Sequence, residues 1–154
     1  MTEKILTLKA DIGAELNVID QIYTRLNRQG DDITHEEQAI VIGYYLHNLY
    51  NAFESIFQRV AETFENDIVD SSRWHTLLLR RMTLDIEDVR PRLLSGETYQ
   101  CLDELRRFRH LFRSTYTSSS DVERLRLVVQ KAHTLDDLYR ADIERFLGYL
   151  DELG

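Results

Sequence analysis

Apolar residues recur at three- and four-residue steps along most of the chain, which is the spacing of one face of an α-helix. Five segments show this pattern. Their apolar positions are Ile5, Leu8, Ile12, Leu16, Ile19, Ile22 and Leu26 in the first, Ile42, Leu46, Leu49, Phe53, Phe57, Val60 and Phe64 in the second, Trp74, Leu77, Leu78 and Met82 in the third, Leu102, Leu105, Phe108 and Phe112 in the fourth, and Leu125, Val128, Val129, Ala132, Leu135, Leu138, Ile143, Leu147 and Leu150 in the fifth.

Polar and helix-breaking residues mark the ends of these segments. Thr34 with Glu37, and Ser120 with Glu123, have the spacing of a capping box at the start of a helix. Pro91 disfavours helical backbone at the residue before it, so the third helix is expected to stop before Arg90 and the proline. The pattern therefore predicts helices at about 2–28, 34–66, 72–89, 97–116 and 120–152.

The connections between these helices are short, and none is long enough to separate two domains. Helices joined by short connections pack as antiparallel neighbours. The sequence therefore predicts an all-α fold, an antiparallel helical bundle of about five helices that forms a single domain over residues 1–154. One proline and six glycines agree with this, because sheet-rich folds generally need more turn residues.

The composition bounds the class of protein. Apolar residues make up 43% of the 154 residues, which is enough for a full hydrophobic core. Cys101 is the single cysteine, so no intramolecular disulfide forms and a reducing compartment fits. The first residues lack the apolar core of a signal peptide, and no stretch approaches 18 consecutive apolar residues. We therefore expect a cytoplasmic protein with no membrane segment.

The charge is unevenly distributed. The formal net charge of -8 argues against a general nucleic-acid coat. Residues 73–126, however, carry eleven arginines, no lysine and a net charge of +3. Arginine suits planar, bidentate contact with phosphate or carboxylate groups. Either an anion-binding surface or a set of surface salt bridges accounts for this concentration.

The histidines do not have the spacing of a metal site. Carboxylate di-metal bundles need glutamate three residues before histidine, and none of the five histidines has one. The sequence also contains no Gly-rich phosphate loop and no GxSxG motif. We expect neither a metal nor a cofactor, and we interpret His75, which follows Trp74, as a structural residue.

One face of the fourth predicted helix gathers Arg106, Arg109, His110, Arg113 and Tyr116 at three- and four-residue steps. The like charges repel one another, and a bound anion or an acidic partner would compensate them. Metal-independent RNA cleavage needs a proton carrier and cations beside the phosphate, which histidine and arginine supply. One histidine provides half of an acid/base pair, and a two-fold dimer would provide the other half.

Three segments together resemble the HEPN superfamily, and within it the HepT-like toxins of bacterial HEPN/MNT toxin–antitoxin systems. They are Leu46–Glu54 (LHNLYNAFE), the pattern Trp74-His75-x-x-Leu78-Leu79-x-x-Met82, and Phe108-Arg109-His110-x-x-Arg113-x-x-Tyr116. The resemblance covers roughly residues 40–150. It implies a five-helix bundle, usually a homodimer, that acts as an endoribonuclease on tRNA or mRNA.

The resemblance also implies roles for residues of the fourth helix. The family's motif is R-x(4–6)-H, in its best-studied form R-x4-H-x-Y. A partner nucleotidyltransferase antitoxin of the MntA type attaches AMP to the tyrosine and silences the toxin. On this sequence the arginine falls on Arg109 and the tyrosine on Tyr116, whereas Ser114 stands at the position of the motif histidine.

We therefore expect Arg109 to stabilise the scissile phosphate, with Arg113 assisting it, and His110 to carry the proton. Tyr116 would accept AMP. Arg106 and Ser114 would contribute to binding RNA phosphates.

Ser114 leaves three interpretations open, because serine does not act as a base at neutral pH unaided. In the first, His110 and Arg113 form a variant catalytic arrangement. In the second, the chain is an inactive member of the family. In the third, it is a non-catalytic binding or scaffold subunit for its nucleotidyltransferase.

Overall fold

The computed structural model of the chain describes residues 2–30, 32–65, 73–112 and 119–153, with the backbone alone at 110–112 and 119–121. Five helices account for most of these residues: α1 (Glu3–Arg28), α2 (Glu36–Phe64), α3 (Trp74–Arg81), α4 (Gly96–Phe112) and α5 (Ser119–Glu152). The described ranges contain no β-strand. The predicted all-α helical bundle is confirmed, while the dimer stays a prediction.

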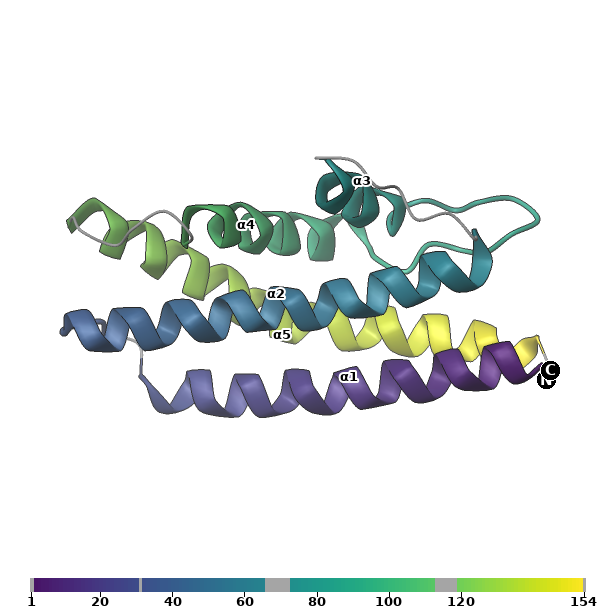
Figure 1. Cartoon of the computed structure of the whole chain (residues 1–154), viewed down its shortest axis with the longest axis horizontal. Helices are drawn as coiled ribbons and strands as arrows, with labels where there is room; N and C mark the ends of the chain where they lie inside the picture. Colours follow the sequence, from purple (N-terminus) through teal and green to yellow (C-terminus); the bar gives the residue numbers. More distant parts are fainter. Residues whose placement is uncertain (1, 31, 66–72, 113–118, 154) are drawn as a thin grey trace.

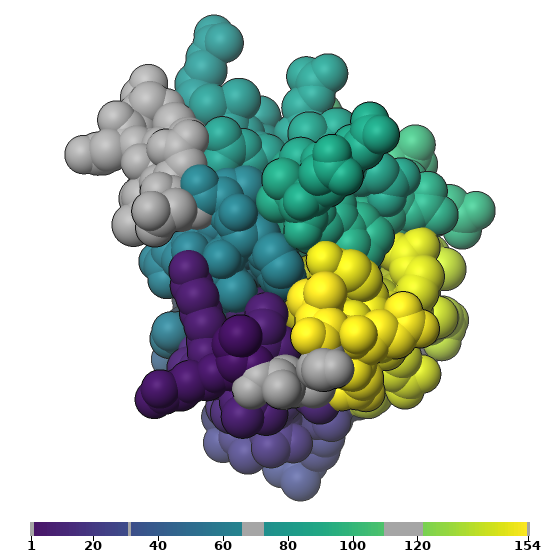
Figure 2. All heavy atoms as spheres, turned by 90° about the vertical axis from the view of Figure 1, so that its right-hand side faces the viewer, coloured from purple at the N-terminus to yellow at the C-terminus, as the bar shows by residue number. Residues whose placement is uncertain are grey.

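α2 is the central helix of the bundle, because it packs against each of the other four. α1 and α2 form a long hairpin, and α5 runs beside them (Figure 1). α4 packs against α2 and α5, and the short α3 lies beside α4 and packs against both α2 and α4 (Figure 1). The start of α1 and the end of α5 lie next to each other (Figure 2), and there Lys9 forms an ion pair with Asp151.

Aromatic side chains fill the centre of the bundle. The ring of Phe53 on α2 meets Tyr139 of α5 edge-on, with ring centroids 5.1 Å apart. Tyr139 stacks in turn on Tyr23 of α1 at 6.1 Å, and the Tyr23 hydroxyl donates a hydrogen bond to the carbonyl of Ala132 at 2.7 Å. Full burial of one such side chain stabilises a fold by roughly 1.5–3 kcal/mol, so these contacts tie three helices together.

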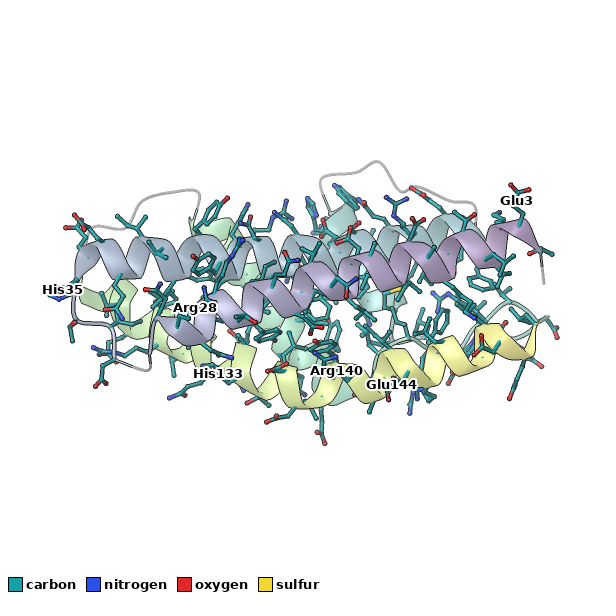
Figure 3. All side chains as sticks on the ribbon, turned by 90° about the horizontal axis from the view of Figure 1, so that it is seen from below. Glu3, Arg28, His35, His133, Arg140 and Glu144 are labelled. Atoms are coloured by element: carbon teal, nitrogen blue, oxygen red, sulfur yellow. The ribbon has the colours of Figure 1, made fainter. Side chains whose placement is uncertain are left out.

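Polar side chains cover the outward sides of α1 and α5, as expected for amphipathic helices (Figure 3). Arg140 on this surface forms an ion pair with Asp20 of α1. Among the residues that the structure describes, no helix is long and apolar enough to cross a membrane.

The start of α2 differs from the predicted capping box. His35, rather than Thr34, is the N-cap, and its side chain makes no capping hydrogen bond. Gln38 accepts a hydrogen bond from the Thr34 amide at 3.0 Å and donates to the carbonyls of Gln29 and Asp32 at 2.8 Å each. The predicted capping box was wrong by one residue, because this glutamine bridges the connection between α1 and α2.

α3 ends earlier than predicted, and residues 82–95 fold back as a loop instead. The amide of Leu93 donates to the carbonyl of Met82 at 2.9 Å. The side chain of Arg90 is fully buried beneath this loop and pairs with Glu65, with Nη2 2.6 Å from Oε1. Arg90 also donates to the backbone carbonyls of Leu84, Pro91 and Arg81, so these three acceptors are satisfied without a helix.

Ser95 fixes the start of α4. Its Oγ accepts a hydrogen bond from the amide of Thr98 at 3.3 Å, as an N-cap does. Asp142 of α5 accepts hydrogen bonds from the Ser95 amide and hydroxyl at 3.0 Å each. α4 is therefore anchored to α5 at its first turn, which sets the register of the residues that follow along the helix.

Candidate functional site

Glu54 is a carboxylate on the buried side of α2. Tyr50 precedes it by one turn, Phe57 follows it by three residues, and both of these rings are fully buried. Residues three and four apart share one face of a helix, so Glu54 is carried into the interior with them. Only 5% of the residue is exposed. Because burial of an unpaired carboxylate is strongly unfavourable, Glu54 requires partners from neighbouring helices.

α3 and α4 supply these partners. The Nδ1 atom of His75 lies 2.8 Å from Oε2 of Glu54. The Nη1 atom of Arg109 lies 3.5 Å from Oε1 of Glu54 and 3.2 Å from Nδ1 of His75. Three ionisable side chains from three helices thus meet where α2, α3 and α4 pack together, and we refer to them as the Glu54–His75–Arg109 cluster.

The donors and acceptors of the cluster assign its protons. Arginine only donates and an ionised carboxylate only accepts. The 2.8 Å contact with Glu54 therefore assigns a proton to Nδ1 of His75. In the neutral ring this leaves the lone pair on Nε2, which is then the atom able to accept a proton. With this tautomer, the 3.2 Å approach of Nη1 of Arg109 to Nδ1 brings two donors together and is not a hydrogen bond.

The three members of the cluster differ in accessibility. The exposed fraction of the side chain is 7% for Glu54, 15% for Arg109 and 32% for His75. The ring of Trp74 packs on that of His75, with centroids 4.1 Å apart. The carboxylate is therefore the buried support, and the imidazole is the group that a ligand reaches most easily.

Tyr50 forms one wall beside the cluster. The Arg109 guanidinium carbon lies 5.9 Å from the centre of the Tyr50 ring, a cation–π contact. Burial, together with the negative charge of Glu54, raises the pKa of the Tyr50 hydroxyl well above its usual range. Tyr50 is therefore a neutral phenol at physiological pH, and its ring helps to fix the plane of the guanidinium.

The arginines earlier in α4 are paired with acidic side chains. Asp103 forms ion pairs with two of them: its Oδ1 lies 2.8 Å from Nη2 of Arg106, and its Oδ2 lies 2.9 Å from Nη2 of Arg107. Glu104 lies 3.4 Å from Nη2 of Arg124 on α5. Acidic neighbours thus compensate the described part of the predicted cationic face. The more exposed of these pairs, such as that of Arg107, which is 57% exposed, contribute at most about 1 kcal/mol each.

The structure brings together only part of the predicted site. Arg109 lies in the cluster, and Arg106 is one turn before it on α4, held by Asp103. The other predicted residues lie outside the side chains that the structure describes; they are His110, whose backbone belongs to α4, and Arg113, Ser114 and Tyr116. The described residues contain no group of three or more histidine, cysteine, aspartate or glutamate side chains that would hold a metal ion.

Sequence reasoning missed two members of the cluster, Glu54 and His75. One signal for Glu54 was available, since it is a charged residue on an otherwise apolar stripe of the second helix. A charge on a buried face requires a partner, and the arginines of the fourth helix were candidates. His75 stands in one of the segments that carry the family resemblance, but that segment assigned it no role, because its contacts depend on the packing of α3 against α2 and α4.

A comparison with protein-family models matches residues 41–150 to a family described as HepT-like protein. The chain belongs to the HepT-like family. This is a HEPN-superfamily family of toxin-like proteins, typically part of toxin–antitoxin pairs. The match spans most of α2, all of α3 and α4, and nearly all of α5, so it includes every helix of the cluster. No curated protein and no solved structure gives a significant match to the HepT-like chain.

Proposed function

We propose that this HepT-like chain is the toxin subunit of a HEPN/MNT toxin–antitoxin pair and that it cleaves tRNA or mRNA without a metal ion. The observation that carries the proposal is the arrangement around Arg109. Its guanidinium is oriented by Glu54 at 3.5 Å and by the ring of Tyr50, and 15% of the side chain is exposed. A cation fixed in advance stabilises the charge that develops on a phosphate during cleavage.

The family motif and the sequence of α4 support the remaining assignments. Arg109 stabilises the phosphorane, Arg113 assists it, and Arg106 and Ser114 bind neighbouring phosphates. His110 carries a proton. The charge of the phosphate backbone compensates the arginines in place of Asp103 and Glu104 when RNA is bound.

Cleavage of RNA in the presence of EDTA tests this activity. We expect the purified protein to degrade tRNA or mRNA. Arg109→Lys should lower the rate by about 100-fold or more, because lysine keeps the charge beside Glu54 but lacks the planar guanidinium that contacts a phosphate through two nitrogens. Arg107→Lys is the matched control, since this side chain is on the same helix and is 57% exposed. Intact RNA after prolonged incubation with the wild-type protein would overturn the proposal.

We also propose that a partner nucleotidyltransferase of the MntA type silences the protein by attaching AMP to Tyr116. Trypsin cleavage after Arg113 and Arg124 releases a peptide in which Tyr116 is the single tyrosine. Co-expression with a nucleotidyltransferase of the MntA type should increase the mass of that peptide by one or more AMP units. Tyr116→Phe should abolish the increase, and an unchanged mass in the wild-type protein would contradict this part of the proposal.

A second candidate function is a non-catalytic binding subunit for the nucleotidyltransferase. Two observations favour it, namely Ser114 at the position of the motif histidine and the carboxylate of Glu54 opposite Arg109. A protein that leaves RNA intact but co-purifies with its nucleotidyltransferase at a fixed stoichiometry would establish this function instead.

A further inference from the structure

His75 has the environment of a proton acceptor rather than that of a packing residue. Glu54 holds its Nδ1 at 2.8 Å, which fixes both the orientation of the ring and the tautomer with a free lone pair on Nε2. A third of the side chain, 32%, is exposed, although its carboxylate partner is almost fully buried. A buried carboxylate that orients a partly exposed imidazole is the arrangement with which enzymes activate hydroxyl groups.

The position of His75 relative to Arg109 is equally specific. Nδ1 lies 3.2 Å from Nη1 of the guanidinium that the proposed function assigns to the scissile phosphate. A phosphate held by Arg109 would therefore lie beside the imidazole ring, with the ribose of the same nucleotide next to it. Base and cation come from different helices of one protomer, and Glu54 fixes the position of both.

We infer that His75 on α3, oriented by Glu54, is the general base of RNA cleavage in this protein and takes the place left by Ser114. The inference rests on the proposed ribonuclease function and adds a residue to it. It also supplies the base within a single protomer, so that base catalysis does not depend on a histidine from a second copy.

The proposed cleavage needs neither a metal ion nor a second reactant. Nε2 of His75 removes the proton of the 2′-hydroxyl, and the 2′-oxygen forms a bond to phosphorus while the bond to the 5′-oxygen breaks. The leaving 5′-oxygen takes a proton from His110 or from solvent. The products are a 2′,3′-cyclic phosphate and a free 5′-hydroxyl, and the proton on His75 returns to solvent.

The charges around the ring suit this reaction. Glu54 faces His75 from α2 and stabilises the imidazolium as it forms. Arg109 faces it from α4 and stabilises the negative charge that develops on the phosphate. Tyr50, the neighbouring titratable group on α2, lies against Arg109 and remains a neutral phenol because burial raises its pKa.

The test is the pH dependence of RNA cleavage in EDTA by the full-length protein, with a short RNA that carries one cleavage site. In the wild-type protein, kcat/KM should rise with pH, as general-base catalysis requires. His75→Ala should lower kcat/KM by about 100-fold or more and remove this rise, and added imidazole should restore part of the rate. His133→Ala on α5 is the matched control and should leave both the rate and the profile unchanged.

His75→Asn separates a catalytic role from a structural one. The asparagine amide still donates a hydrogen bond to Glu54 but has no atom that accepts a proton near neutral pH. We expect it to fold as the wild type does, by circular dichroism, and to be as inactive as His75→Ala. Wild-type activity in His75→Asn, or an unchanged rise with pH, would overturn the inference while leaving the ribonuclease function intact. A wild-type protein that does not cleave RNA would instead overturn the proposed function itself.

Discussion

Truncation of Glu54 measures how strongly the cluster holds α2, α3 and α4 together. Glu54→Ala leaves the guanidinium of Arg109, 15% exposed, without its countercharge and the Nδ1–H group of His75 without an acceptor. Removal of one partner from a buried ion pair destabilises a protein by about 3–5 kcal/mol. Because 32% of His75 is exposed, water compensates part of the loss. We therefore expect the lower end of the range, about 3 kcal/mol.

Urea unfolding followed by far-UV circular dichroism measures this loss. Thermal unfolding gives a second measure, because a loss of 1 kcal/mol in the free energy of unfolding lowers the midpoint temperature of a domain of this size by about 2–4 °C. Glu54→Ala should therefore lower the midpoint temperature by roughly 6–12 °C. Glu54→Gln keeps an oxygen that accepts a hydrogen bond and should lower the free energy of unfolding by only about 1–2 kcal/mol. Glu123→Gln is the surface control, since Glu123 pairs with Arg126 but is 70% exposed, and it should change stability by less than about 1 kcal/mol.

A double-mutant cycle isolates the pair itself. Arg109→Met removes the cation but keeps an unbranched apolar side chain against Tyr50. If the ion pair stabilises the fold, the double variant Glu54→Gln/Arg109→Met should lose less free energy of unfolding than the two single variants together, by about 1 kcal/mol or more. A Glu54→Ala loss no larger than that of Glu123→Gln would refute the reasoning from burial and pairing.

Two further predictions concern buried polar side chains elsewhere in the bundle. Arg90→Ala should lower the free energy of unfolding by about 3–5 kcal/mol in urea titrations, because it leaves Glu65, 11% exposed, without its partner, and a loss below about 1 kcal/mol would contradict the assigned contact. Burial raises the pKa of Tyr139 from 10.0 to about 12, so the folded protein keeps a proton that the unfolded chain loses in this interval, and stability should fall as the pH rises from 10 to 12. In Tyr139→Phe, the free energy of unfolding should decrease less steeply between pH 10 and 12, and Tyr23 and Tyr50 account for the decrease that remains. If the pH dependence is the same as in the wild-type protein, the assigned burial of Tyr139 is wrong.

Local patterns predicted most of the fold. The apolar spacing placed α1, α2 and α5 close to their observed bounds, because helical periodicity is encoded by residues three and four apart. The errors arose where distant contacts intervene. At the start of α2, Gln38 reaches back to Gln29, and after α3 the burial of Arg90 against Glu65 stabilises a loop where the sequence predicted helix.

The sequence by itself determined the helical class, the family resemblance and the position of Arg109 in the motif. The tertiary structure decided what Arg109 contacts, because its partners Glu54 and His75 are 55 and 34 positions away in the chain. No periodicity within a helix encodes contacts at such separations. They arise when apolar faces pack α3 and α4 against α2, and a buried carboxylate then takes the nearest cation and imidazole as partners. Through this packing, Arg109, which was predicted on an open helix face, belongs to a cluster formed by three helices. The same packing brings His75, predicted from the sequence to be structural, next to Arg109.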